Sequence, residues 1–471
     1  KMGSFQPHLE KLKKLMHIND VQLALISDRM LQDMSIGLQK STKSNVRMEM
    51  LPSYVDSLPD GSERGAYIGL DLGGTNLRVL LLTLTDSIDG GAKFDATIKS
   101  ESYKVPNEKL EGTSAELFDF IAANMVDFAI KNGLEEKMLP VGFTFSFPFD
   151  QDRIDHAILK QWTKAYNIKD GVGEDVVQML RDAIARQGSL KFEVVAVCND
   201  TVGTLVSGVS EDQNCQIGLI VGTGTNAAYL EKVSNIESVN GYKDDRFMCV
   251  DMEWEYFADT GALNHFVTEF DKQVDATSPM PGEFIFEKMI SGMYLGEIVR
   301  LILCQLASVG NIFNEKCLGD LGTTGGFDSR YVSDITEEAI AGHGETNVVK
   351  SILASVGVKA SQGDVHTVQL VCEFVSIRAA HLCAAGISAV ARKIKANHPE
   401  KNDLVVTAGV DGSVYAGHPT FDTLLEDKTD ELCRNHGVKV QFIRAKDGSG
   451  KGAALIAAVL TKVSTLVLTT L

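Results

Sequence analysis

The sequence predicts an α/β protein built from two domains. Short apolar runs of strand length alternate along the chain with longer amphipathic runs of helix length, which is the pattern of the α/β class. With 471 residues the chain is longer than one hydrophobic core comfortably serves, so we expect two domains. Hydrophobic residues make up 44% and charged residues 23%, as in ordinary globular proteins.

Individual elements follow from the apolar pattern and its boundaries. A capping box at Thr113 and Glu116 predicts a helix that ends near Gly133. Further helices are expected over 283–306 and 366–395, with a last one from about 450 to 463. Residues 318–363 are rich in Gly, Ser and Thr and favour no single element. Strands are predicted over 66–72, 78–85, 139–145, 194–198, 216–221 and 404–410.

Charge and cysteine usage exclude several classes of partner. The net charge of −18 disfavours nucleic acid and anionic membranes, and we expect no apolar run of membrane-spanning length. The eight cysteines form no CxxC pair and several lie in apolar runs, which favours free thiols in a reducing compartment. We therefore expect a cytoplasmic protein that binds neither nucleic acid nor membranes.

Four glycine-rich turns follow strands or precede helices. Glycine lets the backbone approach a phosphate closely, and the N–H groups of such a turn can hold anionic oxygens. One turn alone is weak support, because glycine turns are common in α/β proteins, but four in one chain are more informative. The turns are Asp71-Leu-Gly-Gly-Thr-Asn-Leu-Arg78, Gly222-Thr-Gly-Thr-Asn226, Gly409-Val-Asp-Gly-Ser413 and Asp447-Gly-Ser-Gly-Lys-Gly452.

Two carboxylates end predicted strands. Asp71 precedes the first glycine turn, where it can hold a magnesium ion through water or simply bond its own backbone. Asp200 stands in Asn199-Asp200-Thr201 after an apolar run, a pattern typical of a helix cap and also of a general base. Phosphoryl transfer needs little more than alignment, charge neutralisation and an acceptor for the hydroxyl proton. Arg78 can pair with phosphate or with a surface carboxylate.

A second group of polar residues suits a neutral sugar, whose hydroxyls need carboxylates and amides. By composition alone each is more often structural, since a helical Glu usually lies on a solvated face. The candidates are Ser146, Thr163, Lys164, Asn199, Asn226, Glu253 and Glu287.

The chain resembles the eukaryotic hexokinases and glucokinases of single-unit size. The segments that carry the resemblance span almost the whole chain: LDLGGTNLR (70–78), GFTFSFP (142–148), WTK (162–164), NDTVGTL (199–205), GLIVGTGTNAAY (218–229), EKMISGMYLGEIVR (287–300), GVDGSVY (409–415) and DGSGKGAA (447–454). The resemblance implies an actin-like ATPase (ribonuclease H-like) fold, in which two α/β domains flank a cleft that closes on the sugar. The small domain would hold 66–199 plus 446–471, and the large domain 1–65 plus 200–445.

The resemblance also assigns roles to these residues, in a monomer or homodimer that takes glucose or another hexose, ATP and Mg²⁺. Asp200 would be the catalytic base and Lys164 a second catalytic group, while Asp71 and Asp200 would each hold the metal through water. The sugar would meet Ser146, Thr163, Lys164, Asn199, Asp200, Asn226, Glu253 and Glu287. The nucleotide would meet Asp71, Gly73, Gly74, Thr75, Asn76, Arg78, Gly222, Thr223, Gly409, Asp411, Gly412, Ser413 and Ser449.

Three positions depart from the family pattern. Glu255 follows Trp254 where the family usually has glycine, and it either alters the charge of the site or points outward. Met293 replaces a polar residue, and Ala416 replaces a lysine. The alternatives to a kinase are an actin-like ATPase, a catalytically silent sugar sensor and a filament protein. A sensor is expected to lose the base or Lys164, and both are present.

Overall fold

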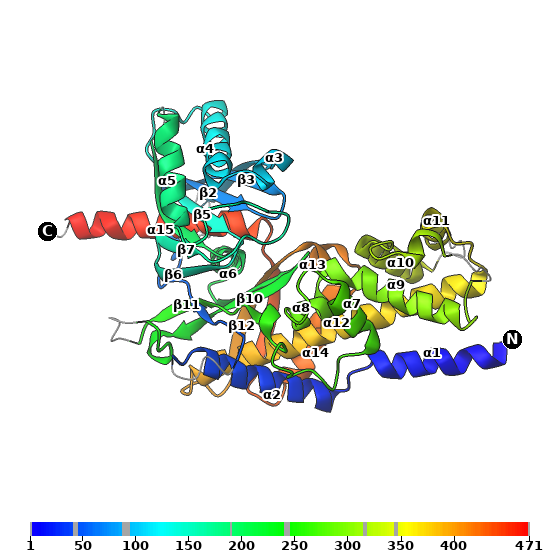
Figure 1. Cartoon of the computed structure of the whole chain (residues 1–471). Helices are drawn as coiled ribbons and strands as arrows, with labels where there is room; N and C mark the ends of the chain where they lie inside the picture. Colours follow the sequence, from blue (N-terminus) through cyan, green and yellow to red (C-terminus); the bar gives the residue numbers. More distant parts are fainter. Residues whose placement is uncertain are drawn as a thin grey trace.

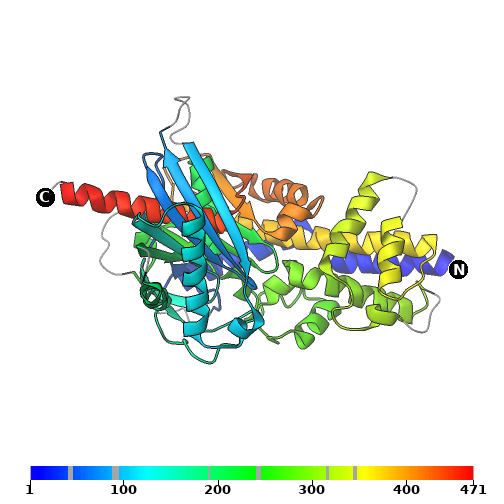
Figure 2. The ribbon, with the colours of Figure 1, turned by 90° about the horizontal axis from the view of Figure 1, so that it is seen from above.

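Two β-sheets divide the molecule into two lobes. The computed structural model describes residues 2–40, 46–86, 95–188, 191–239, 245–313, 318–342 and 347–469, with side chains from 8 to 462. One lobe is built on a five-stranded sheet and the other on a six-stranded sheet, and we call them the small and the large lobe. In Figure 1 the small lobe lies above the large lobe. Figure 2 shows helix α1 and the end of helix α15 at opposite ends of the molecule.

The small-lobe sheet has the order β4-β3-β2-β5-β8. Strand β2 pairs antiparallel with β3 and parallel with β5, so Asp71 lies between Arg78 and Thr144 in the register. Because β2, β5 and β8 are parallel, their carboxyl ends share one edge of the sheet. The strands are β2 (Gly65–Leu72), β3 (Asn76–Thr85), β4 (Asp95–Lys104), β5 (Leu139–Phe145) and β8 (Phe192–Cys198), with a separate hairpin of β6 (Phe149–Arg153) and β7 (His156–Leu159).

The large-lobe sheet has the order β1-β11-β10-β9-β12-β13. Strands β9, β10 and β11 form an antiparallel meander, and β12 and β13 continue parallel to β9. The strands are β1 (Leu51–Pro52), β9 (Cys215–Val221), β10 (Thr225–Lys232), β11 (Phe247–Asp251), β12 (Leu404–Asp411) and β13 (Val438–Arg444).

The two sheets repeat one topology. In each, the first three strands form a meander, and the fourth and fifth strands add in parallel beside the first, giving the order third-second-first-fourth-fifth. This doubled arrangement confirms the actin-like α/β fold class. The sequence shows no internal duplication, because what is repeated is the order of strands and not the residues.

Helices cover the sheets, and two of them join the lobes. Helix α6 packs on β9 and β10, helix α15 packs on β2, β3 and β5, and the two helices pack on each other. The two helices cross closely because Gly452 has no side chain. A Cβ there would lie 1.9 Å from the carbonyl oxygen of Gly203. The helices are α1 (Met2–Met16), α2 (Asp20–Gly37), α3 (Asn107–Leu110), α4 (Ser114–Lys131), α5 (Val176–Gln187), α6 (Asp200–Glu211), α7 (Glu269–Thr277), α8 (Ile285–Ile290), α9 (Gly292–Ser308), α10 (Ser329–Ala341), α11 (Asn347–Ser355), α12 (Gln362–Ala396), α13 (Ser413–Gly417), α14 (Phe421–Cys433) and α15 (Gly448–Thr469), with 3₁₀ turns η2 (Val233–Asn235), η3 (Trp254–Tyr256) and η4 (Gly319–Gly322).

Helix α12 corrects the expectation that no run is long and apolar enough to cross a membrane. Its 35 residues pass that test by length and composition, yet 72% of the apolar window is buried inside the protein. It packs on α2, α9 and α14, which is the place of a core helix.

Two other expectations also change. The helix predicted over 283–306 is broken at Ser291 into α8 and α9, because the first N–H groups of α9 bond the turn that follows β9. Residues 318–363, which favoured no element, contain η4, α10, α11 and the start of α12 in their described part. Seven of the eight cysteines lie in the described residues, and all seven are free thiols.

Candidate active site

The carboxyl ends of β2, β5 and β8 bring three predicted residues to one edge of the small-lobe sheet. Asp71 lies at the end of β2, Ser146 follows β5, and Asp200 opens α6 after β8. The Ser146 hydroxyl donates to Asp200 Oδ2 at 3.3 Å. Asn199 caps α6 by accepting from the N–H of Thr201 at 2.9 Å, so the turn after β8 holds Asp200 at the helix start.

Asp71 is held against the first turn of α15. The Ser449 hydroxyl donates to Asp71 Oδ2 at 2.6 Å. Burial raises the pKa of the Asp71 carboxyl and the nearby charge of Asp200 raises it further, while the Ser449 hydrogen bond opposes the shift. The two carboxylates are therefore close enough to repel each other, and a cation between them would relieve that repulsion.

These two carboxylates suit a metal only as part of a larger ligand set. Among the described residues no three His, Cys, Asp or Glu side chains gather as a metal site. The hard oxygens of Asp71 and Asp200 match magnesium, which typically keeps several waters and takes phosphate oxygens besides one or two carboxylates. The donor set thus fits an ion that arrives with a phosphate-bearing ligand.

The large lobe faces this edge with an amide and two carboxylates. The Asn226 amide nitrogen donates to Asp251 Oδ1 at 2.7 Å and to Glu253 Oε1 at 3.1 Å. Its oxygen accepts from the N–H groups of Ala227 and Trp254. All four Asn226 contacts come from within the large lobe, so the amide is fixed before any ligand binds.

Asp251 is a site residue that the sequence reasoning missed. It ends β11 and is 5% exposed, with the Thr201 hydroxyl 3.3 Å from its Oδ1. Burial and the charge of Glu253 raise its pKa well above the usual range. The sequence did contain a signal for Asp251: a carboxylate at the end of an apolar strand, two residues before Glu253. The same pattern marks Asp71 as a candidate.

Glu287 is held by the turn after β9. Its Oε2 accepts from the N–H of Thr225 at 2.9 Å. A Cβ on Gly224 would lie 2.5 Å from the same oxygen, so a side chain at this position would displace the Glu287 carboxylate. Burial raises the pKa of Glu287 to about 7, with the Thr225 hydrogen bond and the charge of Lys164 opposing the rise.

Thr163 and Lys164 lie on the loop after β7. Lys164 has a φ of 61°, and its Nζ donates to the carbonyl oxygen of Ser146 at 2.7 Å. The ammonium also lies 5.3 Å from the centre of the Phe147 ring. The rings of Trp162 and Tyr166, which flank Thr163 and Lys164 in the sequence, stack on each other. Both also pack on the Phe147 ring, so aromatic contacts fix the loop.

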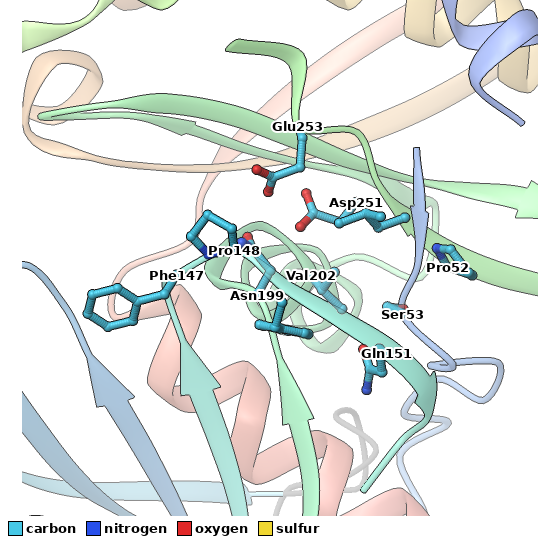
Figure 3. A pocket seen from close by; sticks show the side chains of 11 residues that line it. Pro52, Ser53, Phe147, Pro148, Gln151, Asn199, Val202, Asp251 and Glu253 are labelled. Carbon is cyan, nitrogen blue, oxygen red and sulfur yellow. The ribbon is translucent and has the colours of Figure 1, made fainter. Parts of the chain in front are cut away.

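A cavity between the lobes is lined by three of these polar residues, Asn199, Asp251 and Glu253. Figure 3 shows Glu253 and Asp251 pointing toward Pro148 and Asn199 across it. Its walls come from both lobes and from the start of α6: Leu51, Pro52, Ser53, Phe147, Pro148, Phe149, Gln151, Asn199, Val202, Asp251 and Glu253.

The glycine turns of the large lobe meet at the carboxyl ends of β9 and β12. The N–H groups of Gly292 and Met293 donate to the carbonyl oxygens of Gly222 and Thr223 at 2.7 and 3.1 Å. Gly412 has a φ of 115°, and a Cβ there would lie 2.4 Å from the backbone of Val221. The exposed Thr223 stands at the tip of this cluster.

The remaining turn residues border the same region. Asp411 accepts from the N–H groups of Gly412 and Gly448, and burial raises its pKa. Gly409 lies within β12 and packs on α6, while Ser413 is the first residue of the short helix α13.

The first glycine turn presents exposed polar residues beside Lys164. Gly73 donates its N–H to the carbonyl oxygen of Asn76 at 3.0 Å, and a Cβ on Gly74 would lie 3.6 Å from the Lys164 side chain. Thr75 and Asn76 are exposed. Arg78 pairs with Asp447 at the start of α15, so its guanidinium already has a carboxylate partner.

The three departures from the family pattern lie in different surroundings. Glu255 does not point outward: its Oε2 is shielded from solvent, and burial raises its pKa to about 8. Met293 is 52% exposed in the first turn of α9, and Ala416 lies in α13.

Comparison with known proteins identifies the family. Family models described as hexokinase match residues 8–209 and 216–459. The chain belongs to the hexokinase family. It is 43% identical to rat Hexokinase-2 over 446 residues, which are 94% of this chain and 47% of the relative, and 43% identical to human Hexokinase-3 over 97% and 48%. The chain thus spans about half the length of the curated hexokinases it matches.

Solved hexokinase structures match over their whole length. The Schistosoma mansoni hexokinase complexed with glucose superposes with a TM-score of 0.86 at 38% identity, covering 97% of this chain and 99% of that one. A second hexokinase crystal structure gives 0.80 at 27% identity, covering 97% and 100%.

Proposed function

We propose that this chain transfers the γ-phosphate of ATP to the 6-hydroxyl of glucose or a related hexose, giving hexose 6-phosphate and ADP. The observation that carries the proposal is the position of Asp200, at the start of α6 between the two lobes and hydrogen-bonded to Ser146. Support also comes from the family and from the similarity to a hexokinase whose structure contains glucose.

In this proposal Asp200 accepts the proton of the attacking hydroxyl. A candidate base must lie within hydrogen-bond reach of that proton, and Asp200 directly follows Asn199, which lines the cavity together with Asp251 and Glu253. The hexose hydroxyls would bond Asn226, Glu253 and Glu287 on the large lobe and Ser146, Thr163 and Lys164 on the small lobe. Enclosure between the lobes would keep water from competing for the phosphoryl group.

ATP would lie along the glycine turns, with its phosphates between the first turn and Thr223. Mg²⁺, bound with ATP, would neutralise phosphate charge, and Asp71 and Asp200 would hold it through water. Gly409–Ser413 and Ser449 would border the adenosine. Turnover should accordingly disappear in excess EDTA and return with added magnesium.

The test is hexose-dependent ADP release by the purified chain and by Asp200→Ala. Loss of a general base typically lowers kcat by about 10²–10⁴-fold. Hexose binding by calorimetry should persist in the variant, which separates chemistry from binding. A variant that keeps most of its kcat would remove Asp200 as the base, and ADP release independent of hexose would instead indicate an ATPase.

A further inference from the structure

Tyr166 links the loop after β7 to the first glycine turn. Its hydroxyl donates to the carbonyl oxygen of Gly73 at 3.2 Å. The residue is 5% exposed, and its ring packs edge-on against Phe147 and stacks on Trp162. The aromatic contacts therefore hold the ring, and the hydroxyl is the part that reaches the turn.

The backbone around Tyr166 is fixed as well. The N–H of Tyr166 donates to the carbonyl oxygen of Thr163 at 3.2 Å, and the N–H of Asn167 donates to that of Leu110 at 2.8 Å. The hydroxyl thus projects from a rigid loop, and the same loop carries Thr163 and Lys164 on the sugar side.

The hydrogen bond acts on the peptide group between Gly73 and Gly74. A trans peptide group is planar, and its C=O and N–H point in opposite directions. When the Gly73 oxygen points toward Tyr166, the N–H of Gly74 therefore points away from it. In the part of the chain that the structure describes, this N–H has no hydrogen-bond partner.

The free N–H of Gly74 suits an anionic oxygen, because unpaired N–H groups in glycine turns bind phosphate. The neighbouring N–H of Gly73 is not free, since it donates to the carbonyl oxygen of Asn76 at 3.0 Å. Glycine at both positions leaves the peptide group between them able to rotate, because glycine adopts positive and negative φ with similar ease. A contact outside the turn is therefore needed to hold one orientation, and the Tyr166 hydroxyl makes such a contact.

We propose that Tyr166 is a positioning residue for ATP, whose hydroxyl orients the Gly73–Gly74 peptide group so that the N–H of Gly74 binds a phosphate oxygen. The inference rests on the proposed function, in which this turn meets the ATP phosphates. Tyr166 acts on the nucleotide only through the backbone of Gly73.

Tyr166→Phe tests the hydroxyl alone, because phenylalanine keeps the ring and its aromatic contacts. Calorimetry with Mg²⁺ measures the Kd of the non-hydrolysable analogue β,γ-imido-ATP, with and without glucose, and steady-state kinetics measure the KM for glucose. The Kd of the analogue should rise by about two- to tenfold in the variant, as suits the loss of one hydrogen bond. The KM for glucose should change by less than about twofold, since Thr163 and Lys164 keep their places.

Tyr67→Phe is the matched control. Tyr67 is also buried in the small lobe, and its hydroxyl donates to the carbonyl oxygen of Arg64 at 2.6 Å, at the other end of β2. This variant should bind the analogue as the wild type does. An equal Kd in the wild type and Tyr166→Phe overturns the inference. So does an equal rise in the Kd of the analogue and the KM for glucose, because a loosened loop would affect both sites.

A second readout needs neither substrate. Hydrogen exchange of the unliganded protein reports on the N–H of Gly73, which is bonded across the turn, and it should be faster by about two- to tenfold in Tyr166→Phe and unchanged in Tyr67→Phe. If the wild type phosphorylated no hexose, the proposed function would fail, while this comparison would still decide the role of the hydroxyl. Equal exchange in the wild type and Tyr166→Phe would show that the hydroxyl does not hold the turn.

Discussion

At the scale of single residues, Lys164 has a constrained backbone, and its ammonium group is already hydrogen-bonded. Its left-handed φ of 61° and the hydrogen bond to the Ser146 carbonyl oxygen fix the ammonium beside Ser146, whose hydroxyl donates to Asp200. Such strain is typical of functional sites. The geometry suits stabilisation of charge on a transferring phosphoryl group as well as sugar binding.

Lys164→Met separates these two roles. A cation that acts mainly in the transition state affects kcat more than KM, so we expect kcat to fall by about 10- to 100-fold with a smaller rise in hexose KM. Steady-state kinetics at saturating ATP measure both, and Lys169→Met, at an exposed lysine on the same loop, is the control. A raised KM at unchanged kcat would make Lys164 a sugar-binding residue only.

The sequence could predict those site residues that end strands. Asp71, Asn199 and Asp200 follow apolar runs, and the parallel order of β2, β5 and β8 then brings them together. It could not predict that Arg78 pairs with Asp447, because 369 residues separate them. The burial of Glu255 also escaped prediction, since it depends on a 3₁₀ turn that no periodicity announces.

At the scale of elements, the capping box of α4 was predicted from the sequence and the short helices were not. Thr113 and Glu116 cap α4 reciprocally, as their spacing indicated. By contrast, α8 begins after Phe284 in a left-handed conformation and receives its cap from Asp259, which is distant in sequence. The N-terminal region of α9 is likewise set by tertiary hydrogen bonds to Gly222 and Thr223.

A buried ion pair joins α7 to the core helix α12. Arg378 donates two hydrogen bonds to Asp271, at 2.7 and 2.8 Å, and their side chains are 1% and 3% exposed. Arg378→Met leaves the carboxylate buried and unpaired, so we expect the free energy of unfolding to fall by about 3–5 kcal/mol. Chemical denaturation measures this. The control Lys272→Met breaks the exposed pair with Glu269 on α7 and should cost less than about 1 kcal/mol.

At the scale of the whole molecule, an ion pair crosses from one lobe to the other near the sugar side. Lys160 follows β7 in the small lobe, and its Nζ lies 2.8 and 3.0 Å from the two oxygens of Glu49, just ahead of β1 in the large lobe. The charge of Glu49 also acts on Glu253. The pair therefore spans the lobes beside the cavity, where it favours the lobe arrangement in which these two side chains meet.

Closure driven by hexose gives the last prediction. A sugar that contacts both lobes binds the closed state better, and only that difference shifts the equilibrium. Glu49→Lys or Lys160→Glu alone places like charges across the lobes and should weaken glucose binding by about two- to fivefold, as suits a pair about a third exposed. The double swap restores opposite charges and should recover the wild-type Kd at low salt. Lys131→Glu, which breaks a pair within the small lobe, should leave the Kd unchanged.

Small-angle X-ray scattering with and without glucose measures the motion itself, with a larger radius of gyration expected for the single variants before glucose is added. Additive losses in the double swap, or a radius that glucose does not change in any variant, would show that the lobes are joined rigidly and that the Lys160–Glu49 pair does not control the cleft.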